Sequence, residues 1–305
     1  MLTTAPTRGR LFYRPSMTRS HAFVQLHIAA LLYGLSALFG QALSASPVMI
    51  VFGRAAFALA VLLPLCAWRR SAPWHALRPA DSVRLVLLGI ALAAHWLLFF
   101  VAIQVGGVAV ATLGFATFPA FTALGERLLF SHPMAAKDWA IIGLASLGLI
   151  LVGPGGGGSQ DALAGLGWGV LSGATYAGIA IANKRLNLQA DGLHLSVWQM
   201  VGIVVALLPF AGGEWHTLGA KDWLLLAGLG VLCTGLAYTL FVGSLKAVSA
   251  NTAAVVIAME PVYAIAGAWL LFGDRPTLAM AAGGGLILCA VAWAGQRHEP
   301  AGETA

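Results

Sequence analysis

The sequence predicts an all-α polytopic membrane protein of ten transmembrane helices, arranged as two inverted five-helix repeats. Three observations support this fold class. Of the 305 residues, 59% are hydrophobic and only 9% are charged, whereas about 25% of the residues in a soluble domain are charged. The apolar residues gather in ten runs, and a helix needs about 20 such residues to cross a bilayer. The second half of the chain also repeats a pattern found in the first half.

The internal repeat is clearest around two prolines, Pro119 and Pro261, which are 142 positions apart. Residues 100–130 read FVAIQVGGVAVATLGFATFPAFTALGERLLF, and residues 241–272 read FVGSLKAVSANTAAVVIAMEPVYAIAGAWLLF. At this spacing several small or apolar residues of the first copy recur in the second, namely Ala111, Ala116, Gly125, Leu128, Leu129 and Phe130. A duplicated membrane unit is typical of a transporter.

Short connections separate the expected spans. The spans are residues 22–43, 47–67, 82–104, 107–130, 136–153, 162–184, 192–211, 221–245, 250–272 and 277–296. Tight turns are expected at Gly106–Gly107 and near Lys246–Ser249. The expected organisation is a cytoplasmic tail over 1–21, a first repeat over 22–153, a glycine-rich external linker over 154–161, a second repeat over 162–296 and a cytoplasmic tail over 297–305. Met17 is an alternative start to Met1.

The distribution of lysine and arginine predicts the orientation. With both termini in the cytoplasm, only Lys221 and Arg275 fall in external connections. Fourteen others fall on the cytoplasmic side, as the positive-inside rule requires: Arg8, Arg10, Arg14, Arg19, Arg69, Arg70, Arg78, Arg84, Arg127, Lys137, Lys184, Arg185, Lys246 and Arg297. Because each repeat has an odd number of spans, the second repeat enters the membrane from the opposite side. We therefore expect an inverted repeat with N-in and C-in topology.

Glu260 is the strongest candidate for a functional side chain. It stands in the ninth span, where the first repeat has Phe118, and Pro261 follows it at once. An ionised side chain at the centre of a span costs about 2.5–3.5 kcal/mol on insertion scales. Glu260 therefore either binds a proton or the substrate during transport, or bonds to a facing helix beside the Pro261 break. Tyr263, three residues later, shares its helix face.

Three further side chains are expected at a similar depth. His95 and Trp96 stand in the middle of the third span, and Tyr176 stands in the sixth. His95 either bonds to another helix or contacts substrate in a cavity, where it would relay a proton. Trp96 is either lipid-facing bulk or a surface on which substrate stacks.

Arg54 stands about one-third of the way into the second span from the outside. An arginine stays protonated, so it must reach the interface, a partner or a cavity. The second repeat carries Gln199 in the same place, because Arg54 is ten residues before Pro64 and Gln199 is ten residues before Pro209. This recurrence favours a cavity for both, with Arg54 and Gln199 toward its mouths.

The sequence offers little support for enzymatic or cofactor chemistry. The glycines between Gly153 and Gly158 are not followed by Gly-Lys-Ser/Thr, so they predict no phosphate-binding loop. The three cysteines, Cys66, Cys233 and Cys289, are far apart and have no metal-ligand spacing. We expect no cofactor and no metal. The net charge of +6 predicts no nucleic-acid partner, because the basic residues lie between apolar runs.

The complete pattern resembles the EamA-type transporters of the drug/metabolite transporter superfamily. The resemblance covers the chain from about Leu26 to Gly295, and its most specific part is the segment MEPVYAIAGAWLLFGDRPT. Its other carriers are the two five-span halves, the Tyr33-Gly34 pair, Arg54, and the repeated endings at 119–133 and 261–277. The first copy departs from the family, because Ser131-His132-Pro133 stands where an acidic turn is usual.

The resemblance implies a carrier in the inner (plasma) membrane that moves small metabolites, often by export, through a cavity between the halves. Known relatives handle amino acids, their derivatives, purines or toxic compounds. The expected partners are a small-molecule substrate and membrane lipids. A proton is the coupling ion in the interpretation in which Glu260 binds a proton, which the resemblance does not establish. An exchanger of nucleotide-linked sugars or other organic anions is the alternative within this fold. An intramembrane enzyme and a non-transporting membrane partner are the alternatives of another class.

Overall fold

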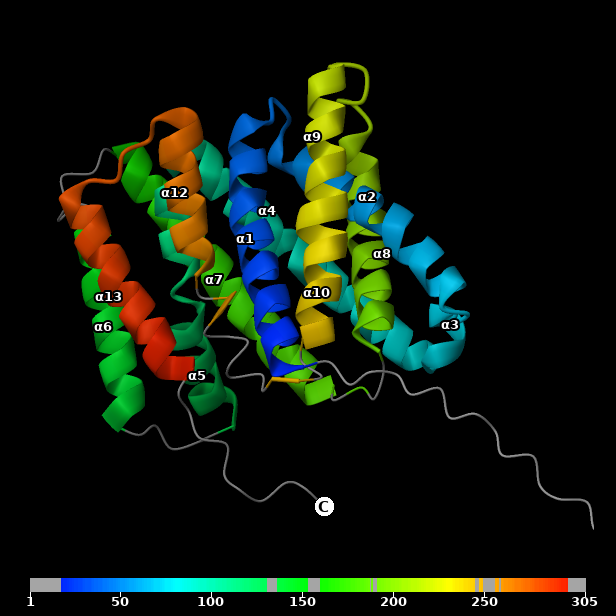
Figure 1. Ribbon diagram of the computed structural model, residues 1–305, viewed down its shortest axis with the longest axis horizontal. Helices are drawn as coiled ribbons and strands as arrows, with labels where there is room; N and C mark the ends of the chain where they lie inside the picture. Colours follow the sequence, from blue (N-terminus) through cyan, green and yellow to red (C-terminus); the bar gives the residue numbers. More distant parts are fainter. Residues whose placement is uncertain are drawn as a thin grey trace, which may run out of the picture.

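The computed structural model is all-helical over the residues that it describes, which are 18–130, 136–152, 160–186, 188, 191–244, 247–248, 256–257 and 259–295. The helices are α1 (Arg19–Ala42), α2 (Pro47–Trp68), α3 (Pro73–Ala76), α4 (Pro79–Phe115), α5 (Phe118–Phe130), α6 (Ala136–Val152), α7 (Gln160–Leu186), α8 (Gly192–Ala211), α9 (Ala220–Gly230), η2 (Val231–Leu236), α10 (Ala237–Ser244), α12 (Glu260–Phe272) and α13 (Leu278–Gly295). In Figure 1, α6 and α13 lie side by side at one end of the molecule, and α2, α3 and α8 lie at the other.

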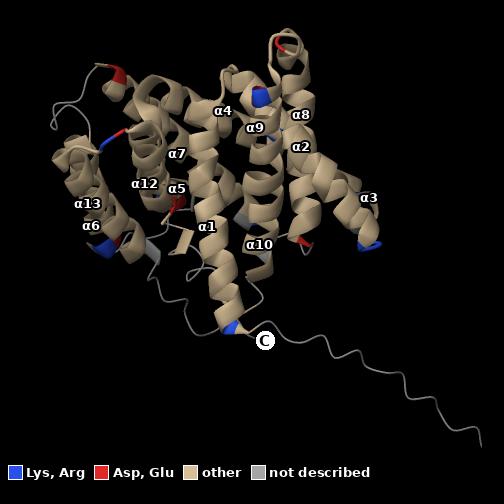
Figure 2. Ribbon diagram, turned by 45° about the horizontal axis from the view of Figure 1, so that its top comes forward, with Lys and Arg blue, Asp and Glu red and all other residues tan. Residues whose placement is uncertain are grey.

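The helices identify a multi-pass membrane protein. Among the described residues, six helices are long and apolar enough to cross a bilayer, and α12 and α13 are shorter apolar helices. Lysine, arginine, aspartate and glutamate lie mostly toward the helix ends, whereas the middle of the helices carries few of them (Figure 2). Large apolar side chains are exposed on the outside, among them Leu128, Leu224, Leu270 and Leu278. Lipid tails would cover such side chains. The expected tails, the linker 154–161 and the turn near Lys246–Ser249 fall wholly or in part outside the described residues.

The expected turn at Gly106–Gly107 is confirmed. Gly107 has φ 80° and ψ 170°, a non-helical backbone conformation inside α4 that favours glycine. The contacts of α4 with α7 show that the chain reverses there. Before the turn, His95 contacts Ser172 and Gly106 lies against Gly165, so the two segments run in opposite directions. After the turn, successive residues of α4 contact successively later residues of α7, from Gly165 toward the C-terminal end of that helix.

A helix break follows that reversed segment, so the expected span 107–130 is not one continuous helix. The segment ends at Phe115, Ala116 and Thr117 form a turn, and α5 begins at Phe118. The Thr117 hydroxyl donates to the Gly114 carbonyl oxygen at 2.7 Å, and Pro119 has no N–H to continue the helical ladder.

The second repeat contains the matching helix. α12 runs from Glu260 to Phe272, which lies 142 positions after the bounds of α5, and Pro261 stands in its first turn. Proline is favoured at the first positions of a helix because its missing N–H has no helical partner there. Glu260 is therefore at the start of a helix rather than inside one. Transporters commonly place such broken helices at their binding sites.

A third irregularity interrupts the expected span 221–245. Residues Val231–Leu236 form the π-helix η2 between α9 and α10. The Thr234 hydroxyl donates to the Leu229 carbonyl oxygen, five residues earlier, at 3.1 Å. Single π turns inside α-helices are frequent at functional sites. No pattern in the sequence predicts this turn.

The same close contact between helices occurs twice. In one contact the glycine belongs to the second half, and in the other it belongs to the first half. A Cβ added to Gly230 on α9 would lie 2.7 Å from the Arg54 carbonyl oxygen on α2. A Cβ added to Gly89 on α4 would overlap the Gln199 carbonyl oxygen on α8. Arg54 and Gln199 therefore hold equivalent positions, as their spacing to Pro64 and Pro209 indicates.

A second exchanged pair surrounds the two helix breaks. A Cβ at Gly34 on α1 would lie 2.9 Å from the Glu260 carbonyl oxygen, where α12 begins. A Cβ at Gly173 on α7 would lie 2.8 Å from the Phe115 carbonyl oxygen and 3.4 Å from the Phe118 nitrogen. The first helix of each half thus packs on the broken helix of the other half. The breaks lie at the interface between the halves.

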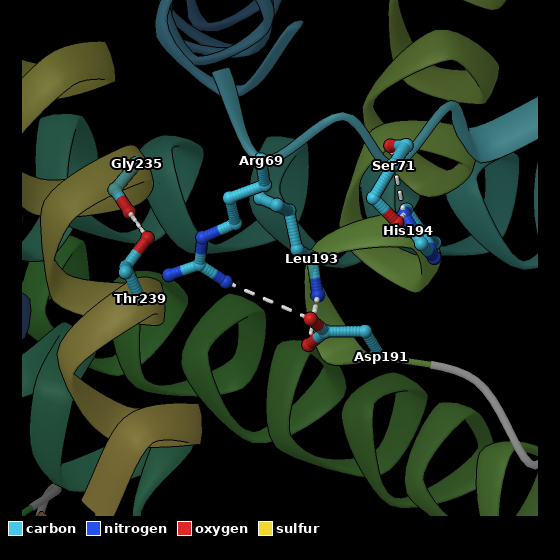
Figure 3. Close-up of polar contacts among 7 residues, drawn as sticks. All are labelled: Arg69, Ser71, Asp191, Leu193, His194, Gly235 and Thr239. Carbon is cyan, nitrogen blue, oxygen red and sulfur yellow. Dashed lines mark hydrogen bonds and ion pairs between the residues drawn. The ribbon is translucent and has the colours of Figure 1, made fainter. Parts of the chain in front are cut away.

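Polar contacts join the halves where α2 ends and α8 begins (Figure 3). Arg69 and Asp191 form an ion pair with 3.6 Å between Nη1 and Oδ2. The Ser71 hydroxyl lies 2.9 Å from His194 Nε2, and the Trp198 indole N–H donates to the Pro73 carbonyl oxygen at 3.3 Å. These contacts fix the connection that contains α3 onto the start of α8.

Candidate functional site

Arg54 extends from α2 into the interior of the bundle, where only 4% of it is exposed. Its Nε and Nη2 groups both donate to the Thr234 hydroxyl on η2, at 3.2 and 3.1 Å. Its guanidinium carbon lies 3.8 Å from the centre of the Trp96 ring and 5.6 Å from that of Phe100. A desolvated cation–π contact of this kind contributes about 2 kcal/mol. The sequence predicts that Arg54 either lies in a cavity or reaches the membrane interface. In the structure its side chain lies in the interior.

Arg54 has no carboxylate within salt-bridge distance in the described part of the chain. The Glu260 side chain lies close enough for the two charges to act on each other. Glu260 is half-buried and accepts no hydrogen bond from any described residue. One buried cation and one carboxyl group therefore face the interior without contacting each other.

Aromatic rings surround Tyr176 on α7. Tyr176 lies 5.0 Å from the His95 ring, 5.5 Å from Phe115 and 5.3 Å from Phe118, measured between ring centres. Phe115 and Phe118 flank the helix break and stack on each other at 5.5 Å. Tyr176 also lies within electrostatic range of Glu260.

His95 is buried, with 4% exposed, and α7 holds it in place. Its Nδ1 lies 3.0 Å from the Ser172 carbonyl oxygen and 2.8 Å from the Ser172 hydroxyl. The Ser172 hydroxyl is also 3.1 Å from the His95 carbonyl oxygen. Ser172 precedes Gly173, so the same turn of α7 both holds His95 and contacts the helix break. This geometry holds the His95 ring beside the Tyr176 ring.

Two other predicted residues lie to the sides of this group. The Tyr263 hydroxyl lies 3.3 Å from Nδ1 of the exposed His27 on α1. The Gln199 amide donates to the Asn183 side-chain oxygen on α7 at 3.0 Å. Both side chains are half-buried. The structure therefore brings Arg54 and Trp96 into contact, places Glu260 and Tyr176 near each other, and gives Tyr263 and Gln199 partners of their own.

Three residues that were not among the predicted site residues belong to the same group. Tyr33 on α1 interacts electrostatically with Arg54, Glu260, Tyr176 and Tyr238. Tyr238 on α10 lies within electrostatic range of both Tyr33 and Tyr176. Tyr33 stands next to Gly34, and that pair was noted only as part of the family resemblance. No sequence pattern indicated Thr234, because its contact with Arg54 depends on the π turn.

The site combines one cation, one carboxyl group and several aromatic rings. Among the described residues, no group of three or more histidine, cysteine, aspartate or glutamate side chains is placed to hold a metal ion. The guanidinium and the carboxyl group offer opposite charges, and the rings offer an apolar surface between them. Such an arrangement offers complementary contacts to a small polar molecule.

The comparisons with known proteins point to a family of membrane transporters. The model of the EamA-like transporter family matches residues 22–153 and 163–295. YxxF of Bacillus subtilis (strain 168), described as an uncharacterized transporter, is 23% identical over 269 residues, which cover 86% of each chain. An uncharacterized transporter of Archaeoglobus fulgidus is 26% identical over 272 residues, covering 87% of this chain and 94% of its own.

One solved structure matches most of the fold. It is titled only as the crystal structure of a protein, and it has a TM-score of 0.62 at 19% identity over 91% of this chain and 97% of its own. The family match and the relatives point to a transporter rather than an enzyme. Because the family model matches both halves over nearly their whole length, this chain belongs to the EamA-like transporter family.

Proposed function

We propose that this protein is a secondary transporter that exports a small metabolite, an amino acid or an amino-acid-like compound, across the inner membrane by alternating access. The observation that carries the proposal is the half-buried Glu260 carboxyl group at a helix break, with Arg54 within electrostatic range and no described residue bonded to it. A carboxyl group deep in a membrane bundle marks a substrate or ion pathway. Its position at the interface of the halves suits a pocket that opens to each side in turn.

Glu260 takes one of two roles in this scheme. It binds the amine of the cargo, or it binds a proton whose release drives the return step. In both roles the positive charge of Arg54 balances the negative charge of ionised Glu260 during part of the transport cycle. Arg54 can do so because it does not lose its own proton. The residues proposed to contact the cargo are Arg54, His95, Trp96, Tyr176, Gln199, Glu260 and Tyr263, with Tyr33 and Tyr238 added from the structure.

The proposed orientation has both termini in the cytoplasm. It follows from the excess of lysine and arginine in the connections expected there. The connection that holds Arg69, Arg70 and Arg78 would then face the cytoplasm, together with the start of α1.

Overexpression in cells challenged with a panel of amino acids and metabolites tests the proposal. Cells that tolerate one compound and show a lower internal concentration of it identify both the cargo and the direction. The purified protein in liposomes should then show saturable counterflow of that radiolabelled compound. Flux that stays linear with concentration would indicate a pore, and no flux of any compound would contradict a transporter.

A further inference from the structure

We propose that Arg54 forms a binding site for a single carboxylate group of the cargo, and that Thr234 on the π turn orients the Arg54 guanidinium group for this contact. This inference rests on the proposed function and adds a chemical class to it. The cargo would carry one carboxylate, and the bound carboxylate would lie in the plane of the guanidinium group.

The hydrogen bonds of Arg54 leave one edge of its guanidinium group without a partner among the described residues. Nε and Nη2 both point at the Thr234 hydroxyl, at 3.2 and 3.1 Å. The edge formed by Nη1 and the second N–H of Nη2 makes no hydrogen bond within the described part of the chain. That edge carries two parallel N–H groups, which match the two oxygens of a carboxylate. A guanidinium group that is 4% exposed and bound on one edge only is costly unless a ligand completes it.

Trp96 restricts the ligand further. Its ring covers one face of the guanidinium group at 3.8 Å, so a ligand above that face is excluded. Thr234 occupies the neighbouring edge, which is formed by Nε and Nη2. A planar anion that approaches in the guanidinium plane is therefore favoured over a bulky one.

The π turn allows Thr234 to accept two hydrogen bonds from Arg54. The Thr234 hydroxyl hydrogen is directed to the Leu229 carbonyl oxygen at 3.1 Å, so its lone pairs remain for Arg54. In a regular α-helix the hydroxyl would bond to a carbonyl four residues earlier and point elsewhere. Thr234 is thus a positioning residue, which acts on the cargo through Arg54.

The charge count indicates a single carboxylate. Among the lysine and arginine side chains whose burial the structure describes, only Arg54 is buried. A substrate with several negative charges, such as a nucleotide-linked sugar, would require more than one cation in the pocket. Glu260 within electrostatic range also disfavours excess negative charge on the cargo. A zwitterion or a monocarboxylate satisfies both groups.

Binding to the purified full-length protein in detergent tests the inference independently of transport. The probes are the common L-amino acids and short monocarboxylates, each compared with its own carboxamide. A ligand that binds the folded state raises the temperature of unfolding. We expect at least one acid to raise this temperature, and its amide to have no effect. Arg54→Gln should weaken binding of that acid about thirtyfold or more, because a buried charge partner is lost.

Thr234 variants separate positioning from packing. Thr234→Val should weaken binding of the acid about tenfold, because two hydrogen bonds to a charged group are lost, and should lower the acid-to-amide preference. Thr234→Ser keeps the hydroxyl and should keep the preference. Thr239→Val is the matched control, since the Thr239 hydroxyl donates to the Gly235 carbonyl oxygen, four residues earlier, at 2.8 Å and not to Arg54 (Figure 3).

Two results would overturn the inference. One is that no acid stabilises the wild-type protein, or that an acid and its amide stabilise it equally. The other is that Arg54→Gln binds the acid as tightly as the wild type does. If an acid binds selectively but shows no counterflow in liposomes, the carboxylate site stands and the transporter proposal fails. If counterflow occurs equally for acids and amides, the transporter proposal stands and the carboxylate site fails.

Discussion

The Arg54 guanidinium group lies on the face of the Trp96 ring, with 3.8 Å between its carbon and the ring centre. The two residues come from α2 and α4, helices that pack against each other in the first half of the chain. Thr234 from the second half holds the same guanidinium group by its edge. A single side chain therefore connects the halves in the interior of the bundle.

Replacement of Trp96 tests whether its ring face orients Arg54. Trp96→Phe keeps an aromatic face and should raise the KM for transport about threefold. Trp96→Ala removes it and should raise the KM about thirtyfold, since a desolvated cation–π contact is worth about 2 kcal/mol. Counterflow at several substrate concentrations measures both. Equal KM values for the two variants would contradict a role for the ring.

Gly34→Ala tests the contact between α1 and the start of α12. The added Cβ would lie 2.9 Å from both the Glu260 carbonyl oxygen and Tyr263 Cβ, so the helices must separate. Overpacking of this kind costs about 1–3 kcal/mol. We expect a lower unfolding temperature and slower transport. Gly143→Ala on α6 is the control, because nothing lies within 4 Å of its added Cβ, and it should be as stable as the wild type or slightly more so.

Gly107→Ala tests the reversal of α4. No atom lies within 4 Å of the added Cβ, so any loss of stability comes from the backbone. At φ 80° and ψ 170° a residue other than glycine is strained by about 1–3 kcal/mol. Thermal unfolding of the purified protein should show this loss. Gly285→Ala on α13 also meets nothing within 4 Å but has a helical backbone, and it should show none.

Asp191 variants separate a helix cap from an ion pair. The Asp191 side chain accepts from the Leu193 N–H at the start of α8, and it also pairs with Arg69 at 3.6 Å. Both side chains of the pair are more than 40% exposed, so the pair contributes about 0–1 kcal/mol. Asp191→Asn keeps a cap and should change stability little. Asp191→Ala should cost about 1 kcal/mol through the lost cap. An equal loss for the two variants would show that the ion pair, which both of them remove, matters more than the cap.

The helical fold could be predicted from the sequence, and the two charged residues of the proposed site stand out in it. Apolar runs have the length that a bilayer requires, and Arg54 and Glu260 are conspicuous because charge is rare in such runs. The matched breaks before α5 and α12 follow from Pro119 and Pro261, which cannot continue a helical ladder.

Other parts of the site could not be predicted. The π turn of η2 has no local sequence signature, so the contact of Thr234 with Arg54 was not foreseen. The pairing of Tyr263 with His27 depends on which face of α12 meets α1, and Gly34 determines that by close packing. Helical periodicity places Tyr263 on the face of Glu260 but does not say what that face contacts.

The role of Glu260 in transport is tested most directly by counterflow with Glu260→Gln, using the cargo identified by the overexpression panel. The variant keeps the size of the side chain and removes its charge. We predict that counterflow falls to about a tenth or less, as expected for loss of a buried charged contact, while the amount of folded protein in the liposomes is unchanged. Asp81→Asn, which alters an ion pair with Arg84 near the start of α4, should transport at the wild-type rate. Wild-type counterflow by Glu260→Gln would remove this carboxyl group from the mechanism.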